Sequence, residues 1–492
     1  MRRLVVLLSL ALAAPAAGAS ALPRLHAERG AQPRIAAAGD RTVLLRGVNV
    51  NQLGDYYRQS PALDPVVPLR RADFAGIASL GMNVVRLLVH WSALEPRPGV
   101  FDEAYLARIR QAVGWARERR IYVVLDMHQD AWGKFIATPD GETCAPGSAP
   151  QQGWDGAPQW ATLTAGAPTC RIGLRELSPA VGLAFQAFWN DQDGIQTALV
   201  KTWAKLAGAF AGDPAVAGYD LLNEPNPGLA LGITDVGPLA QFYARAIPAI
   251  RAAERAAPGG FSHIAFFEPS VIWSAAGTDA PPTPALLTDP DLVFAPHLYG
   301  GSIAAASVAD GYRYAEQAAA QYGATVWSGE WGWFGDPKAN EAAIREYVGL
   351  EDEHLWGGAW WDWKQACGDP HMFGDGADTE PEPVSVSLNR FACPAQTPLG
   401  IPPTTRRLLA RPYVRSAPGR ITQMTSDPAK RVLTVTGSDT NPKGSCALEA
   451  WVPGKARPRT TATHARRVRS VRVRGGWRLS ACVRGDYALT IR

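Results

Sequence analysis

Short apolar runs alternate with longer amphipathic segments along most of the chain. Runs such as MNVVRLLV (82–89) and IYVVLDMH (121–128) are rich in β-branched residues, which is typical of strands buried on both faces of a parallel sheet. Other segments repeat apolar residues every three or four positions, as amphipathic helices do; examples are 103–120 and 195–212. The pattern predicts eight strands, at residues 42–50, 82–89, 121–128, 216–224, 263–269, 292–299, 325–332 and 357–363.

Eight strands in strict alternation with helices predict an α/β protein, a (β/α)8 TIM barrel. The alternative is an open doubly wound sheet, which rarely uses eight such units and carries a Gly-rich phosphate loop after its first strand. Two long insertions follow the third and eighth strands, at 131–180 and 364–400. Both lie on the C-terminal side of the strands, where barrel enzymes place their active-site loops.

The pattern changes after a Pro-rich stretch near residue 400. Segments such as RVLTVTG and RSVRVRG alternate apolar and polar residues with period two, which predicts an antiparallel sheet. We therefore expect three parts: a leader at 1–21, a catalytic barrel at 22–405, and a small antiparallel β-sandwich domain at 406–492.

Charge divides the chain at the same boundary. From Arg406 onward there are 19 Lys and Arg residues against four acids, a net charge of +15, which leaves −11 for the preceding residues out of a total of +4. We expect peripheral contact of the basic domain with an anionic membrane or glycan surface; a solvated basic face that aids solubility is the alternative. No nucleic-acid-binding motif is present, so we expect no nucleic acid partner. We also expect a monomeric protein.

The first 21 residues pair two arginines with an apolar run and a small-residue stretch, which is typical of a secretory signal peptide. We expect cleavage near Ala19 to Ala21 and a secreted protein. Six cysteines suit that compartment. They allow 15 pairings, of which sequence proximity favours Cys144–Cys170, Cys367–Cys393 and Cys446–Cys482.

Two glutamates close apolar strands, Glu224 in YDLLNEPNPG and Glu330 in TVWSGEWGW. Carboxylates at the C-terminal ends of barrel strands are where this fold builds active sites, and a facing pair is the minimum equipment for cleaving a glycosidic bond. Polar or aromatic residues collect at the same end of almost every strand. They are Asn49, Asn51, Arg86, His90, His128, Asp130, Asn223, Glu224, Glu268, His297, Tyr299, Glu330, Trp361 and Trp363. Such a set predicts a catalytic cup.

The motifs LLNEPNPG, DMHQDAW, FAPHLY, WSGEWGW and WWDW resemble those of retaining glycoside hydrolases whose two glutamates end strands four and seven. More narrowly, LDMHQD followed by GWDGAPQWAT resembles the endoglycoceramidase branch of glycoside hydrolase family five. The resemblance implies that Glu224 is the acid/base and Glu330 the nucleophile, with carboxyl groups about 5–5.5 Å apart. Arg86 and Tyr299 are candidates to keep Glu330 ionised, while the pKa of Glu224 should sit higher.

The resemblance also implies the sugar-binding residues. Asn223 matches the residue that holds the sugar 2-hydroxyl, and His297 is placed to orient Glu224. Further groups that grip or stack on the sugar are His128, Asp130, Trp160, and either Trp361 or Trp363. Retaining glycosidases need no metal and no cofactor, and the pair His128-x-Asp130 lacks a third ligand at a fixed offset.

One departure concerns the sugar. Relatives that cut glycosphingolipids generally carry a lysine just after the first strand, whereas GVNVNQLGDYYRQ has none; Asn51, Gln52 or Arg58 would substitute. The leading hypothesis is a secreted retaining β-glycosidase that cleaves between a glycan and an apolar aglycone, such as the glucose- or galactose-to-ceramide linkage. The alternatives are an endo-β-glycanase of the same fold, acting on cellulose- or mannan-type chains, and a non-catalytic glycolipid- or envelope-binding protein.

Overall fold

A computed structural model describes residues 22–229, 236–276, 281–300, 307–333, 338–373 and 380–492. The predicted signal peptide therefore lies outside the described residues. Among the described helices, none combines the length and apolarity that a membrane crossing requires.

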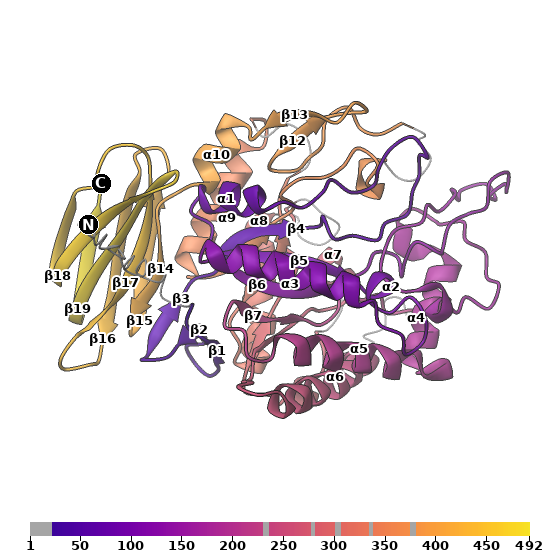
Figure 1. The fold of residues 1–492 in the computed structure, drawn as a ribbon, viewed down its shortest axis with the longest axis horizontal. Coiled ribbons are helices and arrows are strands. Elements are labelled where there is room, and N and C mark those ends of the chain that lie inside the picture. The colour runs from indigo at the N-terminus through magenta and orange to yellow at the C-terminus, as the bar shows by residue number, and fades with distance from the viewer. Residues whose placement is uncertain (1–21, 230–235, 277–280, 301–306, 334–337, 374–379) are drawn as a thin grey trace, which may run out of the picture.

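The predicted barrel is confirmed (Figure 1). Its strands are β4 (Arg46–Val50), β5 (Val84–His90), β6 (Tyr122–His128), β7 (Val216–Asp220), β8 (Ile264–Phe267), β9 (Leu292–Phe294), β10 (Trp327–Trp331) and β11 (Gly357–Trp360). All neighbours pair in parallel, and a bridge between Phe294 and Val326 joins β9 to the start of β10, which closes the ring. Every residue of β5 and β6 is buried, as expected for strands covered on both faces.

Helices cover the outside of the barrel. They are α1 (Arg71–Ala78), α2 (Trp91–Leu94), α3 (Glu103–Glu118), α4 (Pro179–Trp189), α5 (Ile195–Phe210), α6 (Val236–Ala256), α7 (Val271–Ala276), α8 (Val308–Tyr322) and α9 (Glu341–Glu353). In α3 the Asp102 carboxylate accepts hydrogen bonds from two backbone N–H groups of the first turn, which caps the helix. Leu106, Ile109 and Val113 then form the buried stripe at three- and four-residue spacing that the sequence pattern predicts.

The second layer is one antiparallel sheet of nine strands. It contains β14 (Tyr413–Pro418), β15 (Arg420–Asp427), β16 (Val432–Asp439), β17 (Ser445–Pro453), β18 (Thr460–Val473) and β19 (Gly476–Ile491). The sheet curls so that β15 and β16 pack across from β14 around a core that includes Val414, Leu433 and Leu479. The predicted sandwich is thus a single hydrogen-bonded sheet folded onto itself.

The division of the chain differs from the prediction at its beginning. Three N-terminal strands, β1 (Leu25–Glu28), β2 (Arg34–Ala37) and β3 (Arg41–Val43), join the second layer, because β3 pairs with β14. The segment 42–50, predicted as one strand, therefore contributes to both layers. Its apolar pattern runs unbroken across the change of sheet, so the pattern alone does not show the boundary.

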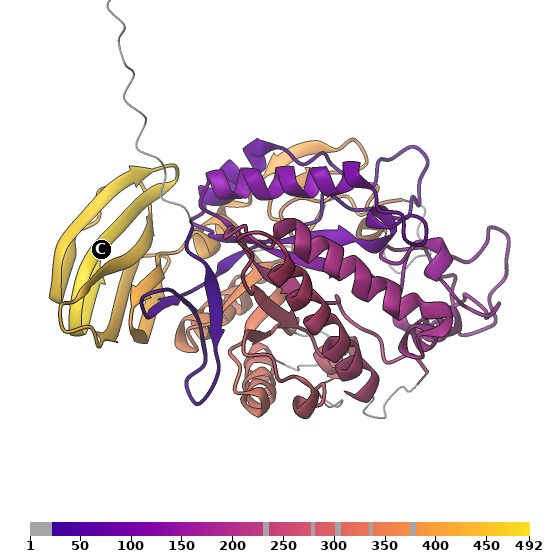
Figure 2. The ribbon, with the colours of Figure 1, turned by 60° about the horizontal axis from the view of Figure 1, so that its bottom comes forward.

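The tail sheet lies against the N-terminal end of the barrel, as Figures 1 and 2 show from two directions. Leu45, Trp327 and Gly357 at the starts of barrel strands line a cavity together with Arg420 and Ile421 of β15. The long loops lie at the opposite, C-terminal end of the barrel. The small hairpin of β12 (Arg390–Ala392) and β13 (Thr397–Gly400), followed by α10 (Pro403–Leu409), returns the chain to the tail sheet.

All three predicted disulfides are present. Cys144–Cys170 closes the insertion after β6, and Cys367–Cys393 closes the one after β11. Cys446–Cys482 joins β17 to β19.

Candidate active site

The deepest part of the cup is a buried arginine surrounded by four carboxylates. Arg86, on β5, is fully buried. Its guanidinium lies 2.8 Å from Asp220 Oδ2 and 2.9 Å from each of Asp126 Oδ1, Glu268 Oε1 and Glu330 Oε1. A charge withdrawn from water is tolerated only when it is paired and hydrogen-bonded. The arginine and the acids therefore depend on one another.

These acids retain protons at unusually high pH. Burial raises the pKa of Asp126 to about 8, of Asp220 to about 6 and of Glu268 to about 7, against the attraction of Arg86. Like charges around one cation cannot all ionise at once. The same three carboxylates are close enough to hold a metal ion, with oxygens within 4.8 Å of one another, but the guanidinium already pairs with all three.

The two glutamates face one another across the cup. Glu330 lies on β10, and Glu224 follows the end of β7 by four residues. A carboxylate oxygen of each lies within 4.8 Å of the other. Glu330 accepts hydrogen bonds from Arg86 Nη1 at 2.9 Å and from the Tyr299 hydroxyl at 2.8 Å. The spacing fits a retaining pair, whereas inverting pairs lie about 6.5–9.5 Å apart.

The backbone of Glu224 adopts a strained conformation. Its φ is +38°, a region that residues with side chains rarely adopt and that costs about 1–3 kcal/mol. The Glu224 backbone N–H donates to Glu268 Oε2 at 2.9 Å, which helps to hold this conformation.

His297 lies between the acids. Its Nδ1 is 2.9 Å from Glu224 Oε1 and 3.5 Å from Glu330 Oε2, and its Nε2 is 3.2 Å from Glu268 Oε1. Burial opposes the charged ring, but Glu268 and Glu330 outweigh it and raise the pKa of His297 well above its usual value. The contact between His297 and Glu224 is the one that the expected orienting role of His297 requires.

A second cation reaches Glu224 from the insertion after β6. Arg175, in the 3₁₀ helix η2 (Arg175–Leu177), lies 3.2 Å from Glu224 Oε2 and 2.6 Å from Asp130 Oδ1, and its guanidinium rests over the Trp154 ring. Arg58, a candidate to replace the lysine that is absent after the first strand, pairs instead with Asp64 at the surface.

The order of the two glutamate pKa values differs from the sequence expectation. Burial opposes ionisation of Glu224, but the His297 hydrogen bond and the Arg175 charge lower its pKa to about 2. Burial raises the pKa of Glu330 to about 7 against His297 and Arg86. The predicted contacts of Arg86 and Tyr299 with Glu330 are present. Arg175, which the sequence pattern did not indicate, and the deep burial of Glu330 account for the difference.

Three further predicted residues line the cup. Asn223 accepts from Arg86 Nη2 at 2.9 Å and donates to the Gln129 carbonyl at 2.9 Å, which fixes its amide. His128 is bound through Nδ1 to Asp126 at 2.7 Å, while its buried Nε2 has no hydrogen-bond partner among the described residues. The Trp361 ring stacks on the His128 ring at 5.5 Å.

Asp130 is the centre of a polar chain along the cup wall. Besides Arg175, it accepts from His371 Nε2 at 2.8 Å, and His371 Nδ1 lies 2.7 Å from Asp369. Asn51 donates to Asp369 at 3.1 Å, so the chain ends beside the first barrel strand. Asp130 is thus held from two insertions.

Two tryptophans lie elsewhere. Trp363 donates to Asp73 on α1 at 3.1 Å, so it packs towards the outer helix, and Trp361 is the one in the cup. Trp160 packs against Trp91 and donates to the Glu95 carbonyl at 3.1 Å; its contact with a sugar stays a prediction.

Sequence reasoning missed several residues of this site. Asp126 and Asp220 lie inside buried apolar strands, and a charge in such a strand signals a buried partner, so the pattern could have revealed them. Arg175, Asp369 and His371 lie in insertions without periodicity, where no local signal separates them from other loop residues.

Exposed apolar residues gather on the loops beside the cup. Ile172 and Leu174 directly precede Arg175, and Leu229 follows β7, with exposed fractions of 64%, 38% and 57%. Phe135, in the same insertion, is 41% exposed. Several aromatic residues of this region belong to the core, namely Trp132, Phe185 and Phe188.

A closed barrel with two carboxylates this close at its C-terminal end is typical of glycoside hydrolases. The family model described as Cellulase (glycosyl hydrolase family 5) matches residues 41–367. The chain belongs to this family and to its endoglycoceramidase-like branch, and it is a glycoside hydrolase.

Known proteins give the same assignment. The chain is 31% identical over 272 residues to endoglycoceramidase I of Rhodococcus hoagii, covering 53% of this chain and 50% of that protein. It is 30% identical to the Cyanea nozakii endoglycoceramidase, over 42% of this chain and 43% of that one. The chain thus spans about half the length of the curated relatives it matches.

Among solved structures, an endogalactoceramidase is 48% identical with a TM-score of 0.89, covering 96% of this chain and 100% of that chain. The lactosyl-enzyme intermediate of endo-glycoceramidase II from Rhodococcus sp. is 25% identical with a TM-score of 0.68, over 95% and 99%.

Proposed function

We propose that this protein is a secreted retaining β-glycosidase that releases the glycan from a glycosphingolipid by cleaving the sugar-to-ceramide bond. The observation that carries the proposal is the pair Glu224 and Glu330, with oxygens within 4.8 Å, on opposite sides of one cup. The relatives named endoglycoceramidase and endogalactoceramidase support the aglycone. The lactosyl-enzyme intermediate of one relative supports a covalent step.

In this mechanism Glu330 attacks the anomeric carbon while Glu224 gives a proton to the departing ceramide oxygen. Arg86 and Tyr299 both hold Glu330 by hydrogen bonds, which orients it for attack. Water, deprotonated by Glu224, then breaks the glycosyl–Glu330 bond. Entry of the leaving oxygen beside Glu224 would displace Arg175 and raise the pKa of that carboxyl.

In this proposal the sugar binds in the cup, and the lipid binds to exposed apolar residues beside it. Trp361 supplies a flat apolar partner for the sugar ring in the cup, and the free Nε2 of His128 is available to a hydroxyl. The exposed Ile172, Leu174 and Leu229 provide an apolar rim for the lipid chains. The apolar rim favours a lipid aglycone over the cellulose or mannan chain of the glycanase alternative.

The two catalytic roles are tested by substrate choice. Glu330→Gln should lose at least about 10⁴-fold in kcat on any substrate, because it removes the nucleophile. Glu224→Gln should lose about 10²–10⁴-fold on a ceramide glycoside and far less on an aryl glycoside whose leaving group needs no proton. Glu316→Gln, an exposed glutamate on α8, is the matched control. Near-normal turnover by Glu330→Gln, or equal losses of Glu224→Gln on both substrates, would contradict the roles.

The aglycone is tested with glucosyl, galactosyl and lactosyl ceramides, alkyl glycosides and soluble polysaccharides. We expect free glycan and ceramide as products, with galactosyl linkages cut best given the 48% identical relative. Leu174→Ser with Ile172→Ser should raise KM for ceramide glycosides and leave short alkyl glycosides unaffected. Hydrolysis of polysaccharide alone would support the glycanase instead.

Export, a monomeric state and an attraction of the basic domain to anionic surfaces complete the proposal. Three disulfides support an oxidising compartment. The N-terminal sequence of protein recovered from culture medium should begin between residues 20 and 22 if the leader is cleaved as expected. Light scattering at working concentration checks the monomer.

A further inference from the structure

The tail sheet carries a long cationic segment without acidic partners. Between Lys455 and Arg484 there are ten Lys and Arg residues and no Asp or Glu. Among the residues that the structure describes, none of these ten forms an ion pair, whereas other cations of the tail sheet do, such as Arg420 with Glu28. The positive charge of this segment is therefore available to an external partner.

The segment is built around an edge strand. Among the described strands, β18 pairs only with β19, and 14 residues of strand span about 45 Å. Arg466, Arg467, Arg469 and Arg472 on this strand are exposed. The ladder is irregular between Thr463 and Ala465 and again between Arg466 and Arg469.

The register places these cations on both faces of the strand. Arg466 and Arg469 lie opposite Cys482 and Ser480, whereas Arg472 lies opposite Trp477. Since opposite residues share a face and faces alternate along β19, the first two arginines and the third point to opposite sides. The cations therefore surround one edge and do not form one flat patch.

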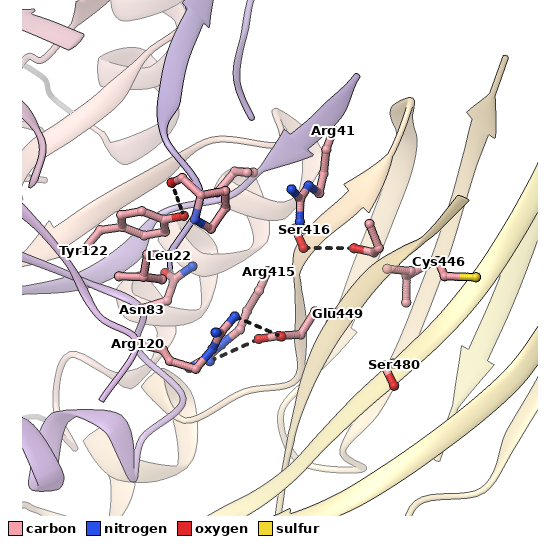
Figure 3. A pocket seen from close by; sticks show the side chains of 14 residues that line it. Leu22, Arg41, Asn83, Arg120, Tyr122, Arg415, Ser416, Cys446, Glu449 and Ser480 are labelled. Atoms are coloured by element: carbon pink, nitrogen blue, oxygen red, sulfur yellow. Dashed lines mark hydrogen bonds and ion pairs between the residues drawn. The ribbon is translucent and has the colours of Figure 1, made fainter. Parts of the chain in front are cut away.

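This edge lies far from the cup. A cavity of ≈ 200 Å³ marks where the sheet meets the barrel bottom; Tyr122 lies on the barrel side, Glu449 and Ser480 on the sheet side (Figure 3). In Figures 1 and 2 the yellow sheet with β18 and the loops after β6 occupy opposite ends of the molecule. A membrane bound at β18 would thus meet the end of the molecule that lacks the apolar rim.

We propose that β18 and its flanks bind a linear acidic polysaccharide, which anchors the protein with its cup directed away from the polymer. A flexible polyanion can follow an edge and contact cations on both faces, while a flat membrane contacts one face. Binding would release counterions, so affinity should fall steeply with salt. This step does not depend on the proposed activity.

The test uses the full chain and immobilised dextran sulfate, with neutral dextran as a blank. We expect the wild type to bind dextran sulfate with an affinity that falls as salt rises. The variant R466Q/R467Q/R469Q/R472Q should lose at least tenfold in affinity and most of the salt dependence. The control R108Q/R110Q/R119Q/K201Q removes the same charge from exposed positions on and beside α3 and α5 and should stay within twofold of wild type. Hydrolysis of a soluble substrate should be unchanged in both.

Two outcomes would overturn the proposal. One is retention of wild-type affinity by the β18 variant. The other is tighter binding to phosphatidylglycerol vesicles than to dextran sulfate or polygalacturonate at equal salt, which would make lipid the partner. Thermal melting verifies folding, and the double variant R466Q/R469Q gives the same comparison if the fourfold variant does not fold.

Discussion

The cup and strand β18 both concentrate charge, but they do so in opposite environments. In the cup, Arg86 is fully buried and contacts four carboxylates within 2.9 Å. On β18, Arg466, Arg469 and Arg472 are exposed and pair with no carboxylate in the described part of the chain. Buried charges interact strongly in a low dielectric and resist salt, whereas exposed ones are screened within about 10 Å at 0.1 M salt. The buried charges of the cup therefore govern stability and protonation, whereas the exposed arginines of β18 govern association.

The largest expected effect comes from removing the buried cation. Arg86→Met leaves several carboxylates buried around an apolar side chain, and such uncompensated charge costs about 3–5 kcal/mol of unfolding free energy. We expect a strongly lowered urea midpoint or failure to fold. Arg469→Met, measured alongside, should unfold like the wild type. If both variants unfolded at the same urea concentration, the buried arginine of the cup would stabilise the fold no more than the exposed arginine of β18.

The next effect is a pH dependence of stability that arises in the cup. Asp126, Glu268 and Glu330 have raised pKa values of about 8, 7 and 7 in the folded protein. The unfolded chain releases these protons near pH 4, so between that value and the folded pKa the folded state binds more protons and loses stability as pH rises. His90 and His128, whose folded pKa values are lowered, oppose this only below about pH 6.5.

We therefore expect the unfolding free energy to fall from pH 6.5 to 8, by about 1 kcal/mol or more in total. Urea titrations at several pH values measure it, and the slope should persist in 0.5 M salt. Asp126→Asn should flatten the slope. A stability that rises over this range would mean that the carboxyls are ionised in the folded protein.

A smaller effect concerns Arg175 and the proton on Glu224. His297, Arg175, Glu268 and Glu330 all face this carboxyl, and removing one cation raises its pKa. Arg175→Gln should therefore move the alkaline limb of kcat/KM, which reports deprotonation of the general acid, to higher pH by about one unit, while Arg175→Lys keeps the limb near its wild-type position. KM should rise as well, because Asp130 loses a partner. An unchanged pH profile in Arg175→Gln would show that Arg175 does not control the proton.

The smallest effect belongs to the exposed strand. Neutralising single arginines of β18 should change the unfolding free energy by less than about 0.5 kcal/mol, since none is in an ion pair within the described residues. Differential scanning calorimetry at low salt is the check. A loss above 1 kcal/mol would show that these cations stabilise the sheet.

The barrel was predictable from the amino-acid sequence, because buried parallel strands and amphipathic helices each have a characteristic period of apolar residues. It also indicated Glu224 and Glu330, which stand where apolar strands end, and the three disulfides, which join near neighbours. The charge division was likewise evident from composition, and with it the basic tail.

Contacts between residues far apart in the sequence depend on the folded arrangement of the chain. Arg175 and His371 come from two separate insertions to Asp130, and loop residues that meet through space leave no period to detect. The protonation of the pair depends on burial and on every neighbouring charge, which no local pattern encodes. The joining of β1–β3 to the tail sheet, and the location of β18 at the end opposite the cup, also follow from long-range pairing. For that reason the sequence indicated the chemistry of the two glutamates, while the fold determined which charged groups surround each of them.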